Sequence, residues 1–265
     1  MEAIIGLIQL NARLDKAESL KAVRRLATRI PDNSIIAIPE YAMYDPTGVK
    51  AEELNRVAET LEGPWVKGLS EIARSKGSCV IGTLIERNSN GKPYNTAVIL
   101  DERGEVIASY RKTHLFDALG YRESDVFTPG ERLFTPVKAC GLRIGLAICF
   151  EIRFPEILRY QALKGADLVV IPSAWYTGHG KEEQYRFLAQ ARAHENTIWI
   201  AAPILYGSRF TGRSMVVDPL GVVTAEAGYG EKVLQARVDT REVERAREIL
   251  PLLSLRRTNL YSGVG

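Results

Sequence analysis

Glu40, Lys112 and Cys149 are the residues whose types and positions could do chemistry, because each follows an apolar run that is typical of a buried strand. A thiol that attacks an acyl carbon needs a base for its proton, a cation or N–H group for the oxyanion, and an acid for the leaving nitrogen. A carboxylate, an ammonium group and a thiol supply these roles without histidine. If the fold brings the three strand ends together, these residues predict acyl chemistry with Cys149 as the nucleophile.

Each of these residues also has an ordinary structural interpretation. A free cysteine is more often inert and buried, and Glu40 and Lys112 could be solvated loop charges. The surroundings of Cys149 favour reactivity, because Pro155 is a residue type that begins helices and the N–H groups at a helix start favour a thiolate. We assign no role to the histidines, which are His114, His179 and His194.

The composition is that of a globular protein with a small-molecule partner. Of 265 residues, 46% are apolar and 25% are charged. The 35 Lys and Arg residues against 32 Asp and Glu residues leave a net charge of +3, too small and interspersed for a nucleic-acid groove or an anionic membrane surface. No apolar run reaches the roughly 18 residues that span a bilayer, and Glu2 stands where a signal peptide carries Lys or Arg. We expect a cytoplasmic protein that binds neither nucleic acid nor membrane.

The three cysteines, Cys79, Cys140 and Cys149, indicate neither a disulfide framework nor a zinc site. They cannot all pair, and none of them has C-x-x-C spacing. At least one thiol is therefore free. Cys79 and Cys140 are expected to be non-catalytic, although proteins of thermophiles can pair such cysteines.

The pattern of apolar residues and turns predicts the elements that position these side chains. Strands are expected at 3–10, 34–38, 78–85, 94–100, 106–110, 142–148, 167–171, 197–202, 213–218, 222–226 and 232–238. Helices are expected at 65–76, 155–164, 182–195 and 241–248, and another begins at a capping box of Asp15 and Glu18. Without repeats or linkers, this order predicts one α/β domain over 1–265, with mixed sheets and helices on their outer faces. The tail at about 240–265 includes an apolar stretch that needs covering, which packing on a partner subunit would provide.

Three segments resemble the signature segments of the nitrilase superfamily of carbon–nitrogen hydrolases. They are IPEY around Glu40, YRKTHLFD around Lys112 and ICFEIRFPE around Cys149. The segments at 122–130 and 190–196 are also similar to segments of that family. Together, three motifs in the family order and spacing are much more specific than any one of them.

The resemblance implies a four-layer αββα sandwich of two mixed sheets that assembles as a homodimer or higher homo-oligomer, with no metal and no organic cofactor. It implies that Glu40 is the general base and Cys149 the nucleophile. Lys112 and the backbone N–H of Phe150 would stabilise the oxyanion, and Glu123 would orient Lys112 and the substrate amide.

The segment after Cys149 is similar to the branch that contains omega-amidases and deaminated-glutathione amidases, and therefore favours amides over nitriles. In that branch an arginine at the position of Arg153 grips a substrate carboxylate, and its planar guanidinium suits that task. A salt bridge of Arg153 with Glu151 or Glu156 is the structural alternative. The chain departs from the branch by having Phe150 and Glu151 in place of Tyr and Asp, which leaves the acyl group open.

Residues Ser173, Ala174 and Trp175 follow an expected strand and are candidates for lining the same pocket. For Trp175, packing in the core is the alternative. The leading hypothesis is a thiol amidase that acts on a small linear amide, with monoamides of dicarboxylic acids as the expected substrates. The alternatives are a nitrilase, an N-carbamoyl amidohydrolase, or a non-catalytic binding or regulatory protein with this fold.

Overall fold

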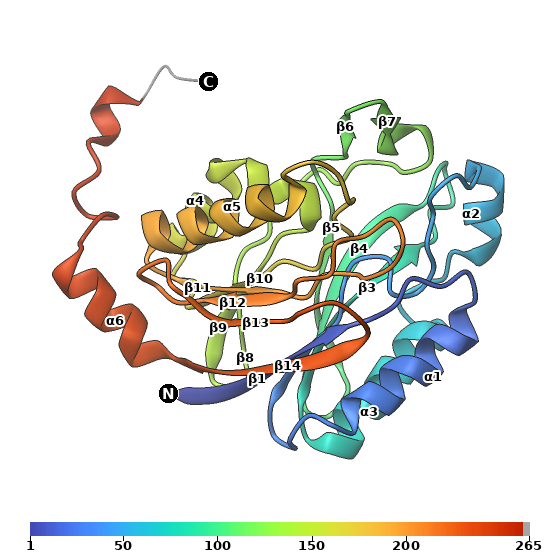
Figure 1. Cartoon of the computed structure of the whole chain (residues 1–265), viewed down its shortest axis with the longest axis horizontal. Helices are drawn as coiled ribbons and strands as arrows, with labels where there is room; N and C mark the ends of the chain where they lie inside the picture. The colour runs from blue at the N-terminus through green and yellow to red at the C-terminus, as the bar shows by residue number, and fades with distance from the viewer. Residues whose placement is uncertain (262–265) are drawn as a thin grey trace.

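The computed structural model describes residues 1–261 and contains two mixed six-stranded sheets (Figure 1). The first sheet has the order β14 (Lys232–Asp239), β1 (Glu2–Gln9), β2 (Ile35–Ala37), β3 (Cys79–Glu86), β4 (Tyr94–Leu100) and β5 (Val106–Arg111). The second has the order β13 (Val223–Glu226), β12 (Met215–Val217), β11 (Trp199–Ala202), β10 (Leu168–Val170), β9 (Leu142–Leu146) and β8 (Val137–Ala139). In each sheet three neighbouring strands are parallel, namely β1 to β3 and β9 to β11.

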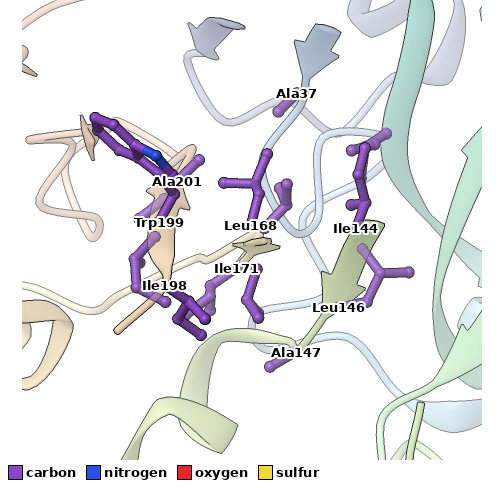
Figure 2. Close-up of a cluster of buried hydrophobic side chains, with 14 of the residues drawn as sticks. Ala37, Ile144, Leu146, Ala147, Leu168, Ile171, Ile198, Trp199 and Ala201 are labelled. Carbon is purple, nitrogen blue, oxygen red and sulfur yellow. The ribbon is translucent and has the colours of Figure 1, made fainter. Parts of the chain in front are cut away.

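The two sheets pack face to face, and helices cover their outer faces. Figure 2 shows part of the interior, where Ala37 of the first sheet lies near Ile144 and Leu168 of the second. Helices α1 (Lys16–Ala27) and α3 (Pro64–Lys76) cover the first sheet, and α4 (Pro155–Leu163) and α5 (Lys181–Asn196) cover the second (Figure 1). The expected four-layer αββα sandwich is therefore confirmed.

The alternation of side chains along the parallel strands explains why the central strands read as continuous apolar runs. In β1, Ile5 and Leu7 face the second sheet, whereas Ile8 packs in the cluster beneath α1 and α3. Both faces of such a strand are buried along most of its length, so most of its positions are apolar. The parallel order is made possible by the crossover helices, because parallel neighbours need a connection that returns along the sheet.

Local sequence signals set the ends of these helices. Asp15 caps α1 by accepting a hydrogen bond from the backbone N–H of Glu18 at 2.9 Å, which is one half of the expected capping box. Pro64 occupies the first turn of α3, and Gly77 ends that helix with a φ of 55°. The helix α2 (Ala51–Val57), the strand β8 and the short hairpin of β6 (Asp117–Ala118) with β7 (Tyr121–Arg122) were not expected from the sequence.

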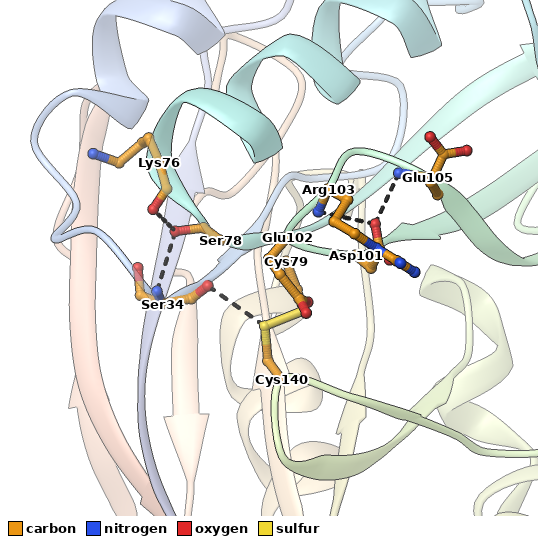
Figure 3. Close-up of a disulfide and its surroundings, with 9 residues drawn as sticks. All are labelled: Ser34, Lys76, Ser78, Cys79, Asp101, Glu102, Arg103, Glu105 and Cys140. Atoms are coloured by element: carbon orange, nitrogen blue, oxygen red, sulfur yellow. Dashed lines mark hydrogen bonds and ion pairs between the residues drawn. A yellow bond between two sulfur atoms is a disulfide. The ribbon is translucent and has the colours of Figure 1, made fainter.

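Cys79 and Cys140 form a disulfide (Figure 3), a pairing that the sequence left open. Cys79 begins β3 of the first sheet, and Cys140 lies in the turn between β8 and β9 of the second. The two residues are 61 positions apart in the chain, and only the packing of the sheets brings them together. The third cysteine, Cys149, is free, as expected for at least one thiol.

The end of the chain leaves the body of the sandwich. Helix α6 (Thr240–Ile249) lies at the side of the sandwich, where its Val243 and Ala246 are buried, and the chain beyond it extends away from the sheets to the 3-10 turn η3 (Thr258–Leu260) in Figure 1. Ile249, Leu255 and Leu260 are exposed along this tail. The packing of residues 240–261 on a partner subunit stays a prediction, and residues 262–265, to which it also referred, lie outside the described residues. Within residues 1–261, no helix combines the length and apolar character needed to cross a membrane.

Candidate active site

Three loops that follow strands bring the predicted catalytic side chains to one cavity. Glu40 follows β2, Lys112 directly follows β5, and Cys149 follows β9. The space within the cavity and its opening to solvent is about 370 Å³. Its lining residues are Glu40, Tyr41, Lys112, Phe116, Tyr121, Glu123, Cys149, Phe150, Ala174, Trp175, Tyr176 and Lys181.

Cys149 sits on a strained turn between β9 and the following helices. Its φ of 48° is in the left-handed region, which a side chain other than glycine rarely adopts. The backbone N–H of Cys149 donates to the carbonyl of Pro172 at 3.0 Å, which ties the turn to the loop after β10. Strain of this kind persists only where the surroundings hold it, and it is common at functional sites. The turn exposes the thiol to the cavity although the residue as a whole is buried.

Lys112 joins the two carboxylates that line the cavity. Its Nζ lies 2.9 Å from Oε1 of Glu40 and 2.8 Å from Oε2 of Glu123. All three side chains are almost completely buried, with exposed fractions of 1–2%. Removing such charges from water is costly unless each one is paired and hydrogen-bonded. We call these three side chains the charge cluster.

Neutral donors complete the coordination of both carboxylates. Asn95 Nδ2 donates to Glu40 at 2.7 Å, and the backbone N–H of Ala174 donates to the other oxygen of Glu40 at 2.8 Å. Tyr41 Oη donates to Glu123 at 2.7 Å, and so does the backbone N–H of Phe116. The carboxylates are therefore held by the strand β4 and by the loops that follow β2, β5 and β10.

The charges of the cluster stabilise one another. Burial by itself lowers the pKa of Lys112, but Glu123 and Glu40 outweigh it and raise that pKa well above its usual value. Burial would raise the pKa of Glu123, yet Lys112 and the other donors hold it below its usual value. Lys112 is thus a permanent cation and Glu123 a permanent anion near neutral pH.

The Cys149 thiol is neutral in this environment. Burial, and after it the negative charge of Glu40, raise the pKa of the thiol well above its usual value, although Lys112 acts in the opposite direction. The thiolate that the helix start was expected to favour is therefore not the resting form. Glu40 acts on the thiol both through its charge and through a hydrogen bond, so its carboxylate lies beside the sulfur.

Glu151 connects the loop of the nucleophile to the loop of Lys112. One of its oxygens accepts from Tyr110 Oη at 2.7 Å and from the backbone N–H of Thr113 at 2.8 Å. Its other oxygen accepts from the backbone N–H of Ile148 at 2.7 Å. The side chain is fully buried, so it fixes the two loops relative to each other and is not available for the salt bridge with Arg153 considered from the sequence.

The residues expected to bind substrate divide into two groups. Phe150, Ala174 and Trp175 line the cavity, whereas Ser173 and Arg153 are not among its described lining residues. Ser173 is fully buried and its hydroxyl lies 2.7 Å from Tyr185 Oη, on the inner side of the loop. Arg153 lies over the Trp175 ring, 4.7 Å from its centroid.

Tyr41, Asn95 and Lys181 belong to the site but were not singled out from the sequence. Tyr41 directly follows Glu40 and has a φ of 57°, which signals a constrained turn only once the structure is known. Asn95 is a polar residue in the buried strand β4, where asparagine is uncommon. That pattern was available in the sequence. For Lys181, at the first position of α5, no sequence signal pointed to the cavity.

The described side chains close enough together to suggest a metal site lie elsewhere. They are Cys79, Glu102 and Cys140, and the two sulfur atoms are bonded to each other. In the cavity, the combination of a thiol, a carboxylate beside it and a buried ammonium group suits the attack of sulfur on a carbonyl carbon.

Comparison with known proteins agrees with this geometry. A family model described as carbon–nitrogen hydrolase matches residues 4–248. The omega-amidase NIT3 of Saccharomyces cerevisiae is 32% identical over 278 residues, which cover 98% of this chain and 95% of that protein. The deaminated glutathione amidase of Mus musculus is 33% identical over 280 residues, which cover 99% of this chain and 85% of that protein.

Solved structures give the same result. The crystal structure of Saccharomyces cerevisiae Nit3, described as a member of branch 10 of the nitrilase superfamily, matches with a TM-score of 0.82 and 31% identity over 97% of both chains. A mutant of an amidase from Nesterenkonia sp., which shows covalent addition of the acetamide moiety of fluoroacetamide at its active site cysteine, matches with a TM-score of 0.78 and 27% identity. That match covers 98% of this chain and 96% of the amidase. The chain therefore belongs to the carbon–nitrogen hydrolase family, within the nitrilase superfamily.

Proposed function

We propose that this protein hydrolyses the carbon–nitrogen bond of a small linear amide through a thioester on Cys149, and that the acyl group of its substrate carries a carboxylate. The observation that carries the proposal is the charge cluster, whose ion pairs of Lys112 with Glu40 and Glu123 line the same cavity as Cys149. A thiol in this setting has a proton acceptor beside it and a positive charge for the oxyanion.

In the first half of the reaction, Glu40 accepts the thiol proton as the sulfur of Cys149 attacks the amide carbon. Lys112 and the backbone N–H of Phe150 donate hydrogen bonds to the oxyanion, and Glu123 holds Lys112 in place. Glu40 then gives the proton to the amide nitrogen, the C–N bond breaks and ammonia leaves.

In the second half, water attacks the thioester carbon and Glu40 accepts a proton from that water. The C–S bond breaks, the carboxylic acid leaves and the sulfur of Cys149 regains its proton. The acyl-enzyme thus divides one difficult bond cleavage into two easier steps. No cofactor takes part in this sequence.

The relatives support an amide substrate over a nitrile. The similar proteins named omega-amidase and deaminated glutathione amidase act on amides by name. In the similar Nesterenkonia amidase mutant, the active site cysteine is the residue that carries the covalent acetamide moiety.

Ammonia release is the measurement that tests the proposal. We expect the wild-type protein to release ammonia from monoamides of dicarboxylic acids, and Cys149→Ala to release none, because no other described thiol lines the cavity. A panel of neutral amides, N-carbamoyl compounds and nitriles is assayed alongside. Cys79→Ala with Cys140→Ala is the control, because it removes the other two cysteines outside the cavity.

Three results contradict the proposal in whole or in part. Ammonia release that persists in a folded Cys149→Ala variant removes the thiol mechanism. Silence of the wild-type protein across the whole panel favours a binding or regulatory protein with this fold. Release from nitriles or carbamoyl compounds alone keeps the mechanism of Cys149 and replaces the substrate class.

A further inference from the structure

Lys181 is a cation that lines the cavity but does not belong to the charge cluster. It is the first residue of α5, and its carbonyl accepts a hydrogen bond from Trp175 Nε1 at 2.9 Å. Its Nζ lies 5.3 Å from the centroid of the Trp175 ring and 5.9 Å from that of Phe116. The ammonium group is thus held between two aromatic rings, on the less buried side of the cavity.

Arg153 is a second cation on the same ring. Its guanidinium carbon lies 4.7 Å from the centroid of Trp175, and its Nη2 donates to Oε1 of Gln184 at 3.1 Å. Within residues 1–261, neither Lys181 nor Arg153 forms an ion pair with a carboxylate. The two carboxylates that line the cavity are already bound to Lys112.

Two partly buried cations without a counter-ion disfavour each other. Burial, and after it the positive charge of Arg153, lower the pKa of Lys181. Burial also lowers the pKa of Arg153. An anion bound between these side chains removes this penalty, and the aromatic rings strengthen its attraction by excluding water.

We infer that Lys181 binds a carboxylate on the substrate, remote from the reacting amide, and that Lys181 rather than Arg153 selects anionic amides. This inference rests on the proposed function. The amide lies at the buried end of the cavity, beside Cys149 and the charge cluster, and the carboxylate points to Lys181. Arg153, which does not line the cavity, acts by holding α5 through Gln184 and by adding positive charge.

The experiment compares succinamate with its methyl ester, which has the same amide and chain but no charge. Lys181→Met removes the charge and keeps a long apolar side chain against the two rings. Because Lys181→Met loses the ion pair with the substrate carboxylate, kcat/KM for succinamate is expected to fall by about 10- to 100-fold. The value of kcat/KM for the methyl ester is expected to change by less than about threefold. Lys181→Arg restores the charge and most of the preference.

Lys164→Met is the matched control. The Nζ of Lys164 also lies over an aromatic ring, 5.7 Å from the centroid of Tyr160, but Lys164 does not line the cavity. This variant is expected to leave kcat/KM unchanged for both substrates. Equal losses for succinamate and its ester in Lys181→Met show that Lys181 only supports the structure and overturn the inference. A larger charge-selective loss in Arg153→Met than in Lys181→Met also overturns it.

A binding measurement separates this inference from the proposed function. Calorimetry records the affinity of succinamate for Cys149→Ala, with and without Lys181→Met. If the wild-type protein hydrolyses no amide but Lys181→Met still weakens binding by about 10- to 100-fold, the anion site stands and the amidase proposal falls. If succinamate binds equally well with and without Lys181→Met, or binds to neither protein, the inference is overturned whatever the activity.

Discussion

The two sheets are joined at both ends of the sandwich, but by different kinds of interaction. At one end, the disulfide joins Cys79, which begins β3, to Cys140, which precedes β9 (Figure 3). At the other end, Glu40 after β2 and Cys149 after β9 meet at the charge cluster. The first end needs no ionised group to hold the sheets together. The second end buries two carboxylates and one ammonium group.

The difference separates stability from function. A disulfide limits the conformations of the unfolded chain and thereby stabilises the folded state. Buried charges lose their hydration, and their mutual attraction offsets that loss only when their partners are all in place. We therefore expect changes at the disulfide end to alter the free energy of unfolding alone, and changes at the charged end to alter both that free energy and the activity.

The largest expected effect is that of Lys112→Ala. This change leaves Glu40 and Glu123 as two buried carboxylates in one cavity without their shared cation. We expect kcat to fall by about two to three orders of magnitude, because an oxyanion donor is lost. The free energy of unfolding is expected to fall by about 3–5 kcal/mol, because a buried pair is broken. Steady-state kinetics and urea denaturation measure the two quantities.

Arg24→Ala is the control for this variant. Arg24 also pairs with a glutamate, Glu71, but both side chains are about half exposed and lie outside the cavity. Removing a pair of this kind is expected to change the free energy of unfolding by no more than about 1 kcal/mol and kcat not at all. A mild loss of kcat in Lys112→Ala contradicts the role of this residue in stabilising the oxyanion. Backbone N–H groups would then be the donors that stabilise it.

The long strands and helices of the fold could be predicted from the sequence, and the short ones could not. Runs such as β1 and β3 are mostly apolar, and α3 has a proline at its start and a glycine just after its end. The short α2, with seven residues, has no capping side chain, and its formation depends on contacts that the local sequence does not specify. The pairing of Cys79 with Cys140 likewise follows from the packing of the sheets and not from their spacing.

The site could be predicted where its residues follow strands. Glu40, Lys112 and Cys149 combine that position with a family motif, so they were found together. Asn95 and Lys181 lie on other elements, and each contributes only because a distant segment packs beside it. The raised pKa of the Cys149 thiol was also unforeseen, because the sequence does not show how deeply the thiol is buried or that Glu40 lies beside it.

The second prediction tests the disulfide end. The double variant Cys79→Ala with Cys140→Ala removes the disulfide between two residues that are 61 positions apart. It is expected to lower the free energy of unfolding by up to about 4 kcal/mol, because the unfolded chain gains conformational entropy when this loop is no longer closed. At 25 °C we expect kcat to stay unchanged, because the bond lies at the end opposite the cavity. Thermal denaturation and ammonia release measure both effects.

A reductant provides the control for this variant. Dithiothreitol is expected to lower the melting temperature of the wild-type protein to that of the double variant and to leave the double variant unchanged. A fall in kcat without a fall in melting temperature contradicts the division of roles between the two ends.

The smallest expected effect, and the finest test of the charged end, is that of Tyr41→Phe. The Tyr41 hydroxyl is one of the donors that hold the pKa of Glu123 low, together with Lys112 and the backbone N–H of Phe116. Its loss is expected to lower the free energy of unfolding at pH 7 by about 1–2 kcal/mol, because a hydrogen bond to a charged group is lost. A carboxylate with a lowered pKa stabilises the folded state above its unfolded pKa, and this stabilisation disappears as the pH falls through the folded pKa. The acid limb of the stability curve of Tyr41→Phe is therefore expected to begin at a higher pH, and kcat to fall by several-fold because Lys112 is held less firmly.

Tyr110→Phe is the matched control, because Tyr110 is also a buried tyrosine that donates to a buried glutamate, Glu151, at 2.7 Å, but outside the charge cluster. Glu151 keeps its other donors, including the backbone N–H groups of Thr113 and Ile148. Tyr110→Phe is therefore expected to lower stability to a similar extent at pH 7 while leaving the charge on Glu123 untouched. If kcat falls equally in both tyrosine variants and their stability curves have the same acid limb, the charge cluster acts through the packing of the two loops. The two ends of the sandwich then differ in rigidity, and the charge of Glu123 does not distinguish them.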